Sequence, residues 1–313
     1  MRRLLITGGT GYLGTELVRQ SQESGGVVAA SYSSRPPSVD APPEVHWLPL
    51  DVGDGAAVDE GVAMFRPDTI IHTAFRQHDP GLWEVTAGGT RNVARAAQSL
   101  GARLIHLSSD VIFRGETGRG ETGGDGTEPR PVPYAAYTEA DPPDPMTTYG
   151  AAKADAERFV QEWCTNAVVV RTSLIYGVRS LDRHTRFVLD IAEGVRPGVL
   201  FHDEFRCPIF VEDLAAALLE LVAHSYRGVL HVAGAEPVSR YEFGVLLAQA
   251  YGRDTDRIPL GWSRESAEPR PRNCTLDIGL ARSLLRTPLR GVREVLAQEM
   301  VRATDGKVRE NQG

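Results

Sequence analysis

The chain has no excess of basic residues: 34 lysines and arginines face 41 acidic residues, so the formal net charge is −7. Proteins that bind nucleic acids usually carry a basic stripe, so this balance argues against a nucleic-acid partner. Cysteine is scarce, and Cys164, Cys207 and Cys274 form neither a disulfide framework nor a paired metal motif. A low cysteine content without disulfide spacing suits a reducing compartment, and we expect a cytoplasmic protein.

Long hydrophobic runs and metal-binding patterns are also lacking. No apolar run approaches the length of a membrane span, so no membrane partner is expected. None of the eight histidines is spaced as a metal pair with a carboxylate, so no metal site is predicted. His72, His106 and His231 are expected to pack at strand ends rather than to act as ligands.

Lysine is the scarcest charged residue. Of the 34 basic residues 32 are arginine, which leaves Lys153 and Lys307. A coding bias towards arginine explains the composition as a whole. Under such a bias, a lysine inside the folded region raises the question of what an arginine could not do there.

The first 110 residues alternate between short apolar runs and helical patterns. Strands are predicted at residues 4–6, 27–30, 45–48, 69–72 and 103–107. Helices are predicted at residues 12–23 and 87–100. Short, fully apolar strands separated by helices are typical of a parallel sheet covered on both faces. The fold class is therefore α/β, a Rossmann-type doubly wound sheet with a smaller C-terminal substrate lobe.

The later elements suggest how the domains divide. Helices are predicted at 148–164, 186–193, 211–224 and 240–251, with strands at 167–170 and 229–232. Residues 1–175 and about 207–235 would form the Rossmann domain, and about 176–206 and 236–302 the substrate lobe. A Gly/Pro-rich insertion at 114–145 is expected to be a surface loop or lid, and residues 303–313 a flexible tail.

A glycine-rich turn follows the first predicted strand and opens the first helix. Gly8 permits the tight turn, Gly11 lets the backbone approach a pyrophosphate, and Gly14 lets the helix pack close to the sheet. The helix N-terminus then offers free N–H groups to the phosphates. The turn predicts dinucleotide binding through these glycines and the intervening Tyr12 and Leu13.

The residues after the second strand favour NADP(H) over NAD(H). An NAD site would place an acidic residue there, but this chain has Ser33, Ser34 and Arg35, which could donate to a 2′-phosphate. Arg35 could equally be a solvated loop residue. After the third strand, Asp51 and Val52 lie where an adenine edge would be read, although Asp51 could also be an ordinary turn residue.

Tyr149 and Lys153 lie four residues apart, which places a phenol and an ammonium on one helical face. A carbonyl that accepts hydride needs a proton on its oxygen, and a phenol with a pKa near 10 is a poor proton shuttle at neutral pH. A nearby ammonium would lower that pKa. Lysine can also reach the ribose hydroxyls of a nicotinamide cofactor, which a planar guanidinium would meet differently.

Three features of the sequence belong together: the three glycines of the turn, a Ser-Ser-Asp segment that closes the fifth strand, and the pair Tyr149 and Lys153. In these features the chain resembles the extended short-chain dehydrogenase/reductase family. The resemblance implies a catalytic Ser or Thr that hydrogen-bonds the substrate carbonyl. Ser109 fits that place best, with Ser108 as its neighbour. It also implies that the segment after the fourth strand, Thr73, Ala74 and Phe75, lines the cofactor.

Four segments are similar to the branch of dTDP-4-dehydrorhamnose reductases: residues 108–115, 171–177, 208–215 and 270–277. The resemblance implies an NADPH-dependent reductase of a ketone, with the 4-keto group of a nucleotide-linked 6-deoxysugar as the expected substrate. Its candidate substrate-binding residues are Ser108, Arg206, Arg270 and Arg272. Arg270 and Arg272 either clamp a diphosphate or are surface charges.

Two alternatives stay open. The first is an epimerase or dehydratase of the same fold that retains NAD, against which the missing acidic residue after the second strand counts. The second is a non-catalytic NADP-binding regulatory subunit resembling that of methionine adenosyltransferase. The expected ligand is a small molecule, and a homodimer is a further expectation.

Overall fold

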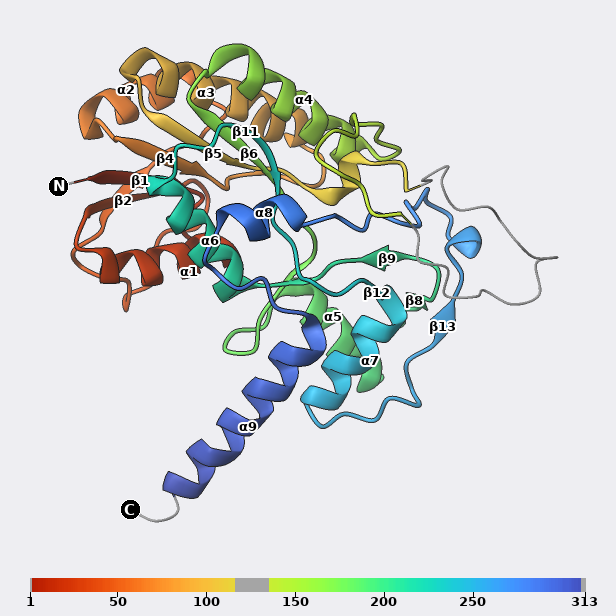
Figure 1. The fold of residues 1–313 in the computed structure, drawn as a ribbon. Helices are drawn as coiled ribbons and strands as arrows, with labels where there is room; N and C mark the ends of the chain where they lie inside the picture. Colours follow the sequence, from red (N-terminus) through yellow and green to blue (C-terminus); the bar gives the residue numbers. More distant parts are fainter. Residues whose placement is uncertain (1, 116–134, 311–313) are drawn as a thin grey trace.

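Seven parallel strands form the centre of the molecule (Figure 1). The computed structural model describes residues 2–115 and 135–310. The strand order is β3-β2-β1-β4-β5-β6-β11, which is the doubly wound order in which the chain turns back at β1. The strands are β1 (Arg3–Thr7), β2 (Val27–Tyr32), β3 (His46–Pro49), β4 (Thr69–His72), β5 (Arg103–Leu107), β6 (Ala167–Arg171) and β11 (Gly228–His231).

Helices cover both faces of this sheet (Figure 1). One face carries α2 (Gly55–Phe65), α3 (Gly89–Leu100) and α4 (Thr148–Trp163), and α3 is preceded by a π-helical turn at Glu84–Gly88. The other face carries α1 (Tyr12–Ser21), α6 (Val211–Ala223) and the short α8 (Gly279–Leu284). The predicted α/β Rossmann-type class is confirmed.

A second lobe lies beyond the carboxyl ends of the strands. Its helices are α5 (Arg183–Ala192) and α7 (Arg240–Ala250). Short strands pair around them: β7 (Ile175–Tyr176) with β10 (Ile209–Phe210), β8 (Leu200–Phe201) with β13 (Leu260–Gly261), and β9 (Phe205–Arg206) with β12 (Val238–Ser239). A separate hydrophobic cluster fills the lobe, including Tyr176, Phe210, Phe243, Leu247 and Val295. The exact division into domains stays a prediction.

The last helix, α9 (Val292–Glu310), starts against α7 and projects away from the rest of the molecule (Figure 1). Its first turns bury Val292, Val295 and Leu296. We expected regular structure to end near Ala303, but the helix is continuous to Glu310. A polar composition does not by itself end a helix, because Arg, Glu and Lys are good helix formers. Flexibility of this segment stays a prediction.

The predicted insertion falls largely outside the described residues, because residues 116–134 belong to neither described range. Its described ends contact the rest of the chain: the Gly115 N–H donates to the Tyr137 hydroxyl (3.1 Å), and the Arg114 guanidinium pairs with Asp144 (2.7 Å). Among the described residues, no helix is both long enough and apolar enough to cross a membrane.

Candidate active site

The glycine-rich turn between β1 and α1 has the geometry of a phosphate cradle. Gly8 has a φ of +70°, a left-handed conformation that favours glycine, and a Cβ at Gly14 would collide with the Gly8 carbonyl oxygen. Gly11 is the N-cap of α1 and has no side chain to occupy the first N–H groups, so they remain available to an anion. Leu13 is buried beneath the turn.

Tyr12 connects this turn to the second lobe. Its hydroxyl donates to the Ser180 carbonyl (3.1 Å), in the loop that leads into α5. The same loop is held from the other side by the Tyr251 hydroxyl, 3.5 Å from the Gly177 carbonyl. The Tyr12 hydrogen bond therefore joins the first turn of α1 to the loop that precedes α5.

The loop after β2 brings the predicted 2′-phosphate residues to the edge of the turn. Ser33, Ser34 and Arg35 are exposed. The Arg35 guanidinium donates to the Thr10 carbonyl, and the Thr10 hydroxyl donates to the Arg35 carbonyl (3.1 Å). Arg35 is thus held beside the glycine-rich turn, at the place where an adenosine ribose would lie in a fold of this class.

The ends of β3 and β4 supply the remaining predicted cofactor residues. Asp51 accepts a hydrogen bond from the backbone N–H two residues further on (2.9 Å), as an ordinary turn residue does, and Val52 is buried. Thr73 is buried and donates to the Thr7 carbonyl (2.7 Å). Ala74, which follows it, is part-buried. The four residues therefore follow the carboxyl ends of β3 and β4, two strands of the same parallel sheet.

Tyr149 and Lys153 lie on α4, whose first turn is capped by the Thr147 hydroxyl, which accepts from the Gly150 N–H (3.0 Å). Lys153 is 3% exposed, and its Nζ donates to the Leu107 carbonyl (2.8 Å) at the end of β5. Phe75 contacts both residues: its ring centre is 5.2 Å from Lys153 Nζ and 5.8 Å from the Tyr149 ring centre. The structure therefore brings these three predicted residues together.

The charges around the pair differ from our expectation. Burial lowers the pKa of Lys153 to about 8, and Glu157 partly opposes this shift. Burial raises the pKa of Tyr149; Arg183 lowers it, and Asp110 raises it. We expected Lys153 to be the cation that lowers the phenol's pKa. In the structure its ammonium is engaged by a backbone carbonyl, and Arg183 supplies the opposing charge.

Ser109 and Ser108 remain distinct candidates for orienting a carbonyl. Ser109 is part-buried and caps the 3₁₀ helix at Asp110–Ile112, where its hydroxyl is 3.4 Å from the Val111 N–H. Ser108 is 2% exposed, and its hydroxyl has no hydrogen-bond partner among the described residues. The greater exposure of Ser109 favours it as the group that meets substrate.

A stacked pair of histidines lies in the sheet, on β4 and β5, close enough for the Lys153 charge to affect both rings. His72 and His106 have ring centres 5.4 Å apart and are fully buried. His72 is held between the hydroxyls of Thr7 (2.6 Å) and Thr90 (3.1 Å). Burial lowers the pKa of His72 to about 3, and the Lys153 charge adds to that shift. Both rings are packed in the protein interior, as predicted.

The three predicted substrate arginines gather around a pair of adjacent carboxylates. Arg206 is 3% exposed and pairs with Glu204 (3.1 Å). Arg270 pairs with the same carboxylate (3.4 Å), and Arg272 pairs with Asp203 (3.5 Å). The burial and pairing of Arg206 favour a role in holding this region together. Arg270 and Arg272 are exposed enough to contact a ligand.

Sequence reasoning missed two arginines, Arg183 and Arg240. Arg183 is the first residue of α5, and its guanidinium donates to the Gln77 side chain in the loop after β4. Arg240 is the first residue of α7, and its Nη1 atom is buried without a hydrogen-bond partner among the described residues. Nothing in the local sequence separates these two from the other arginines.

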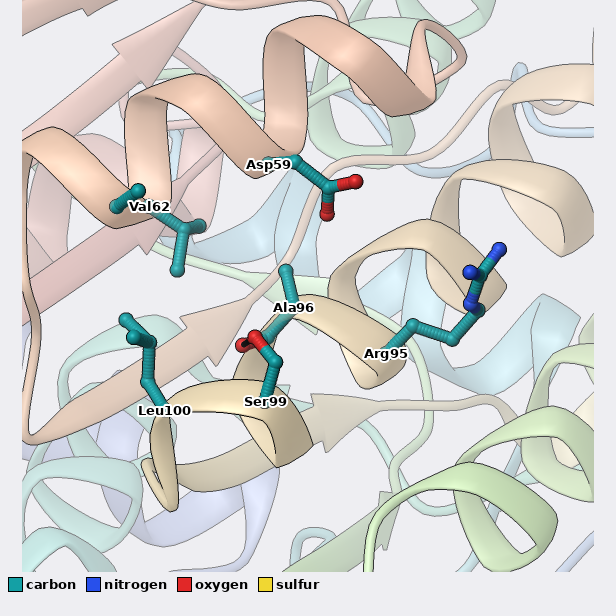
Figure 2. Close-up of a pocket in the computed structure, with 7 residues that line it drawn as sticks. Asp59, Val62, Arg95, Ala96, Ser99 and Leu100 are labelled. Atoms are coloured by element: carbon teal, nitrogen blue, oxygen red, sulfur yellow. Dashed lines mark hydrogen bonds between the residues drawn. The ribbon is translucent and has the colours of Figure 1, made fainter.

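Two further observations concern possible sites elsewhere. A pocket between α2 and α3 (Figure 2) is lined by Asp59, Val62, Ala63, Arg95, Ala96, Ser99 and Leu100. None of these is a predicted site residue, so we assign it no role. Within residues 2–115 and 135–310, no group of three His, Cys, Asp or Glu side chains could hold a metal ion. His231, the third histidine singled out from the sequence, is buried.

A doubly wound sheet, a glycine-rich turn at its first helix and a Tyr-Lys pair at the carboxyl ends of the strands define a class: NAD(P)-dependent oxidoreductases of the extended short-chain dehydrogenase/reductase type. More narrowly, the chain belongs to the RmlD substrate-binding domain family, whose model matches residues 1–304.

Relatives with two different descriptions are similar to the chain. The chain is 31% identical over 317 residues to methionine adenosyltransferase 2 subunit beta of Xenopus laevis, covering 94% of this chain and 87% of that protein. It is 30% identical over 305 residues to dTDP-4-dehydrorhamnose reductase of Mycobacterium tuberculosis, covering 94% and 91%. A solved structure of dTDP-4-dehydrorhamnose reductase from Bacillus anthracis in complex with NADP has a TM-score of 0.76 and 24% identity, covering 96% and 99%.

Proposed function

We propose that the protein is an NADPH-dependent reductase of a ketone, with the 4-keto group of a nucleotide-linked 6-deoxysugar as substrate. The arrangement of Tyr149, Lys153 and Phe75 beside the carboxyl end of β5 carries this proposal. The similarity to a dTDP-4-dehydrorhamnose reductase supports the substrate class. We further propose a cytoplasmic location and a homodimer.

The residues of the site fit a nicotinamide dinucleotide. The turn at Gly8 and Gly14 is too tight for larger side chains, and the start of α1 offers N–H groups to a diphosphate. Ser33, Ser34 and Arg35 would donate to a 2′-phosphate, and none of these three residues directly after β2 is a carboxylate that would repel it. Together they support NADP(H) over NAD(H).

In this proposal NADPH supplies the hydride that reduces the carbonyl carbon. Tyr149 donates its phenolic proton to the carbonyl oxygen, and the Ser109 hydroxyl orients that oxygen by a hydrogen bond. Lys153 would contact the ribose hydroxyls of the bound cofactor. Burial favours the neutral, proton-bearing form of Tyr149 before reaction, and Arg183 stabilises the phenolate left afterwards.

The test is Tyr149→Phe, which removes the proton donor and retains the ring. We expect loss of NADPH oxidation over a panel of keto-sugar nucleotides by about a thousandfold, with the Kd for NADPH nearly unchanged. Tyr226→Phe is the matched control, because that hydroxyl donates to the Val229 carbonyl (2.6 Å) away from the site. A Tyr149→Phe variant that keeps most of its activity would exclude this mechanism.

A second candidate function is favoured by one specific observation, the 31% identity to a methionine adenosyltransferase subunit. In that function the chain would bind NADP without turnover and regulate a partner enzyme. It is favoured if the wild-type protein binds NADPH, consumes none with the whole panel, and forms a stable complex with a methionine adenosyltransferase. A third candidate, an NAD-retaining epimerase or dehydratase, requires nicotinamide that stays bound through purification.

A further inference from the structure

Phe75 is half-exposed, although its ring contacts two residues of the candidate active site. Its side chain is 43% exposed, and Lys153 Nζ lies over the face of its ring, 5.2 Å from the centre. The Tyr149 ring is tilted against it, with the two ring centres 5.8 Å apart. A cation within about 6 Å of an aromatic ring, over its face, is attracted by the negative potential of the π electrons. Phe75 therefore covers Lys153 and at the same time favours its charged form.

Burial acts against the Lys153 charge. The side chain is 3% exposed, and burial lowers its pKa to about 8. Its Nζ donates to the Leu107 carbonyl (2.8 Å). Glu157, one helical turn further along α4, opposes the shift, but its carboxylate also pairs with Arg171 (2.9 Å). The face of an aromatic ring therefore matters more here than at an exposed lysine, because cation–π attraction strengthens where water is excluded.

The other titratable groups near Lys153 are neutral, engaged or exposed. His72 on β4 and His106 on β5 are kept neutral, because burial and the Lys153 charge lower the pKa of each. The Asp110 carboxylate, in the 3₁₀ turn that packs against α4, is engaged by a serine hydroxyl (2.6 Å) and an arginine (3.6 Å). Glu84, in the π-helical turn that packs against α4, is exposed. Two arginines of α3 lie over aromatic rings further along α4: Arg91 over Phe159 and Arg95 over Trp163.

The loop that carries Phe75 is anchored by the Thr86 hydroxyl. Thr86 is fully buried in the π-helical turn, and its hydroxyl donates to the Arg76 carbonyl (2.7 Å) and accepts from the Arg76 N–H (2.9 Å). One side chain thus bonds both backbone polar groups of the residue that follows Phe75. The Thr90 hydroxyl donates to the Thr86 carbonyl (2.6 Å) and lies 3.1 Å from Nε2 of His72. These hydrogen bonds connect the loop to the interior of the sheet.

We propose that Phe75 is the positioning residue of Lys153: the face of its ring stabilises the ammonium, and the Thr86 hydroxyl holds the loop that carries the ring. The charged ammonium is then available to the ribose hydroxyls of the proposed cofactor. The inference rests on the proposed function for this consequence, but the contact itself requires neither cofactor nor turnover.

The first test replaces Phe75 with trifluorophenylalanine, which keeps the shape of the ring and removes most of the negative potential of its face. Because Lys153 and Lys307 are the two lysines of the chain, isotope labelling of lysine Cε gives two signals, and Lys307→Arg identifies that of Lys153. An NMR titration of this signal, in protein without added cofactor, gives the pKa of Lys153. We expect the fluorinated ring to lower this pKa by about 0.5 unit or more.

The matched control is the same replacement at Phe159, on the same helix as Lys153, because that ring also contacts a cation, the exposed Arg158 (4.4 Å). It should leave the pKa of Lys153 unchanged. An unchanged or raised Lys153 pKa in the Phe75 variant would overturn the proposal, since the ring would then be only an apolar cover.

A second pair of variants tests the anchor. Thr86→Val keeps the shape of the side chain and removes the hydroxyl that bonds the Arg76 backbone. We expect it to abolish the nuclear Overhauser signal between the Phe75 ring protons and the Lys153 Cε protons. Thr86→Ser retains a hydroxyl and should restore that signal. A folded Thr86→Val protein with the wild-type signal would overturn the role of Thr86 in holding the ring.

These measurements use neither substrate nor turnover, so they separate the inference from the proposed function. A lowered Lys153 pKa in the fluorinated Phe75 variant, in a protein that reduces no keto-sugar, would leave the inference standing and remove the reductase. In an active reductase, the alkaline limb of the kcat profile should move to lower pH by the same amount, because the reaction uses the charged ammonium. A reductase whose Lys153 pKa does not respond would contradict the inference alone.

Discussion

Lys153 is enclosed in a way that an arginine could not reproduce. Its Nζ donates to the Leu107 carbonyl at 2.8 Å, and the side chain is 3% exposed. A planar guanidinium would keep the charge but displace the group that is proposed to hold the ribose. We expect Lys153→Arg to lower kcat for NADPH oxidation by about a hundredfold. Arg158→Lys, at an exposed position of the same helix, should leave kcat unchanged.

Lys153 should also make stability depend on pH. Burial lowers its pKa to about 8 in the folded protein, whereas the unfolded chain keeps a value near 10.4. Between these values the unfolded chain binds the proton and the folded protein does not, so stability rises with pH. Relative to Lys153→Met, the wild-type free energy of unfolding should rise by about 2 kcal/mol from pH 7.5 to pH 10, as measured with urea. If the difference in unfolding free energy between wild type and Lys153→Met does not change with pH, the Lys153 ammonium is not buried as described.

Among single residues, the sequence predicts those whose spacing along the chain places two reactive side chains together. Tyr149 and Lys153 were identifiable because four residues make one helical turn and lysine is rare in this chain. Arg183 was not, because its influence on Tyr149 arises from the fold, which brings together residues that are distant in sequence. The raised pKa of Tyr149 has the same origin, since packing from several elements produces it.

The junction of β1 and α1 gives a test at the scale of elements. A Cβ at Gly14 would meet the Gly8 carbonyl oxygen and push the helix away from the turn. We expect Gly14→Ala to weaken NADPH binding by about a hundredfold or more. The control is Gly61→Ala inside α2, where the new methyl group would make ordinary contact with Leu50 (3.7 Å). Isothermal titration with NADPH compares the two, and equal binding would exclude the phosphate cradle.

The loop after β2 should set the cofactor preference. Arg35 is exposed and held beside the turn by Thr10, so its loss should not disturb the fold. We expect Arg35→Gln to raise the KM for NADPH about tenfold and to change the KM for NADH little, because NADH has no 2′-phosphate. Arg282→Gln on α8 serves as an exposed control. If Arg35→Gln raises the KM for NADPH and the KM for NADH by the same factor, Arg35 does not bind the 2′-phosphate.

Fully buried strands were predictable from the sequence, whereas the two-residue strands of the second lobe and helix α2 were not. The predicted strands at residues 69–72 and 103–107 coincide with β4 and β5, because both are buried along their whole length. The two-residue strands of the second lobe, such as β7 and β10, are too short to show any periodicity. α2 was missed although Asp54 caps it, accepting from the Ala56 N–H (2.9 Å).

At the scale of the whole molecule, the chemistry lies between two bodies of structure. The Rossmann domain carries the glycine-rich turn, Tyr149 and Lys153, and the second lobe carries Arg183, whose charge lowers the pKa of Tyr149. The Tyr12–Ser180 hydrogen bond joins the two sides. Ligands of open α/β folds bind at the carboxyl ends of the strands, so this arrangement follows from the topology.

The most direct test of the central claim is to follow hydride. NADPH deuterated at the transferable C4 position is incubated with the protein and a nucleotide-linked 4-keto-6-deoxysugar, and the product is analysed by mass spectrometry. We predict a product with one deuterium on the new carbinol carbon, formed by wild type and not by Tyr149→Phe. A wild-type protein that binds NADPH but transfers no deuterium to any keto-sugar nucleotide would contradict the assignment as a reductase.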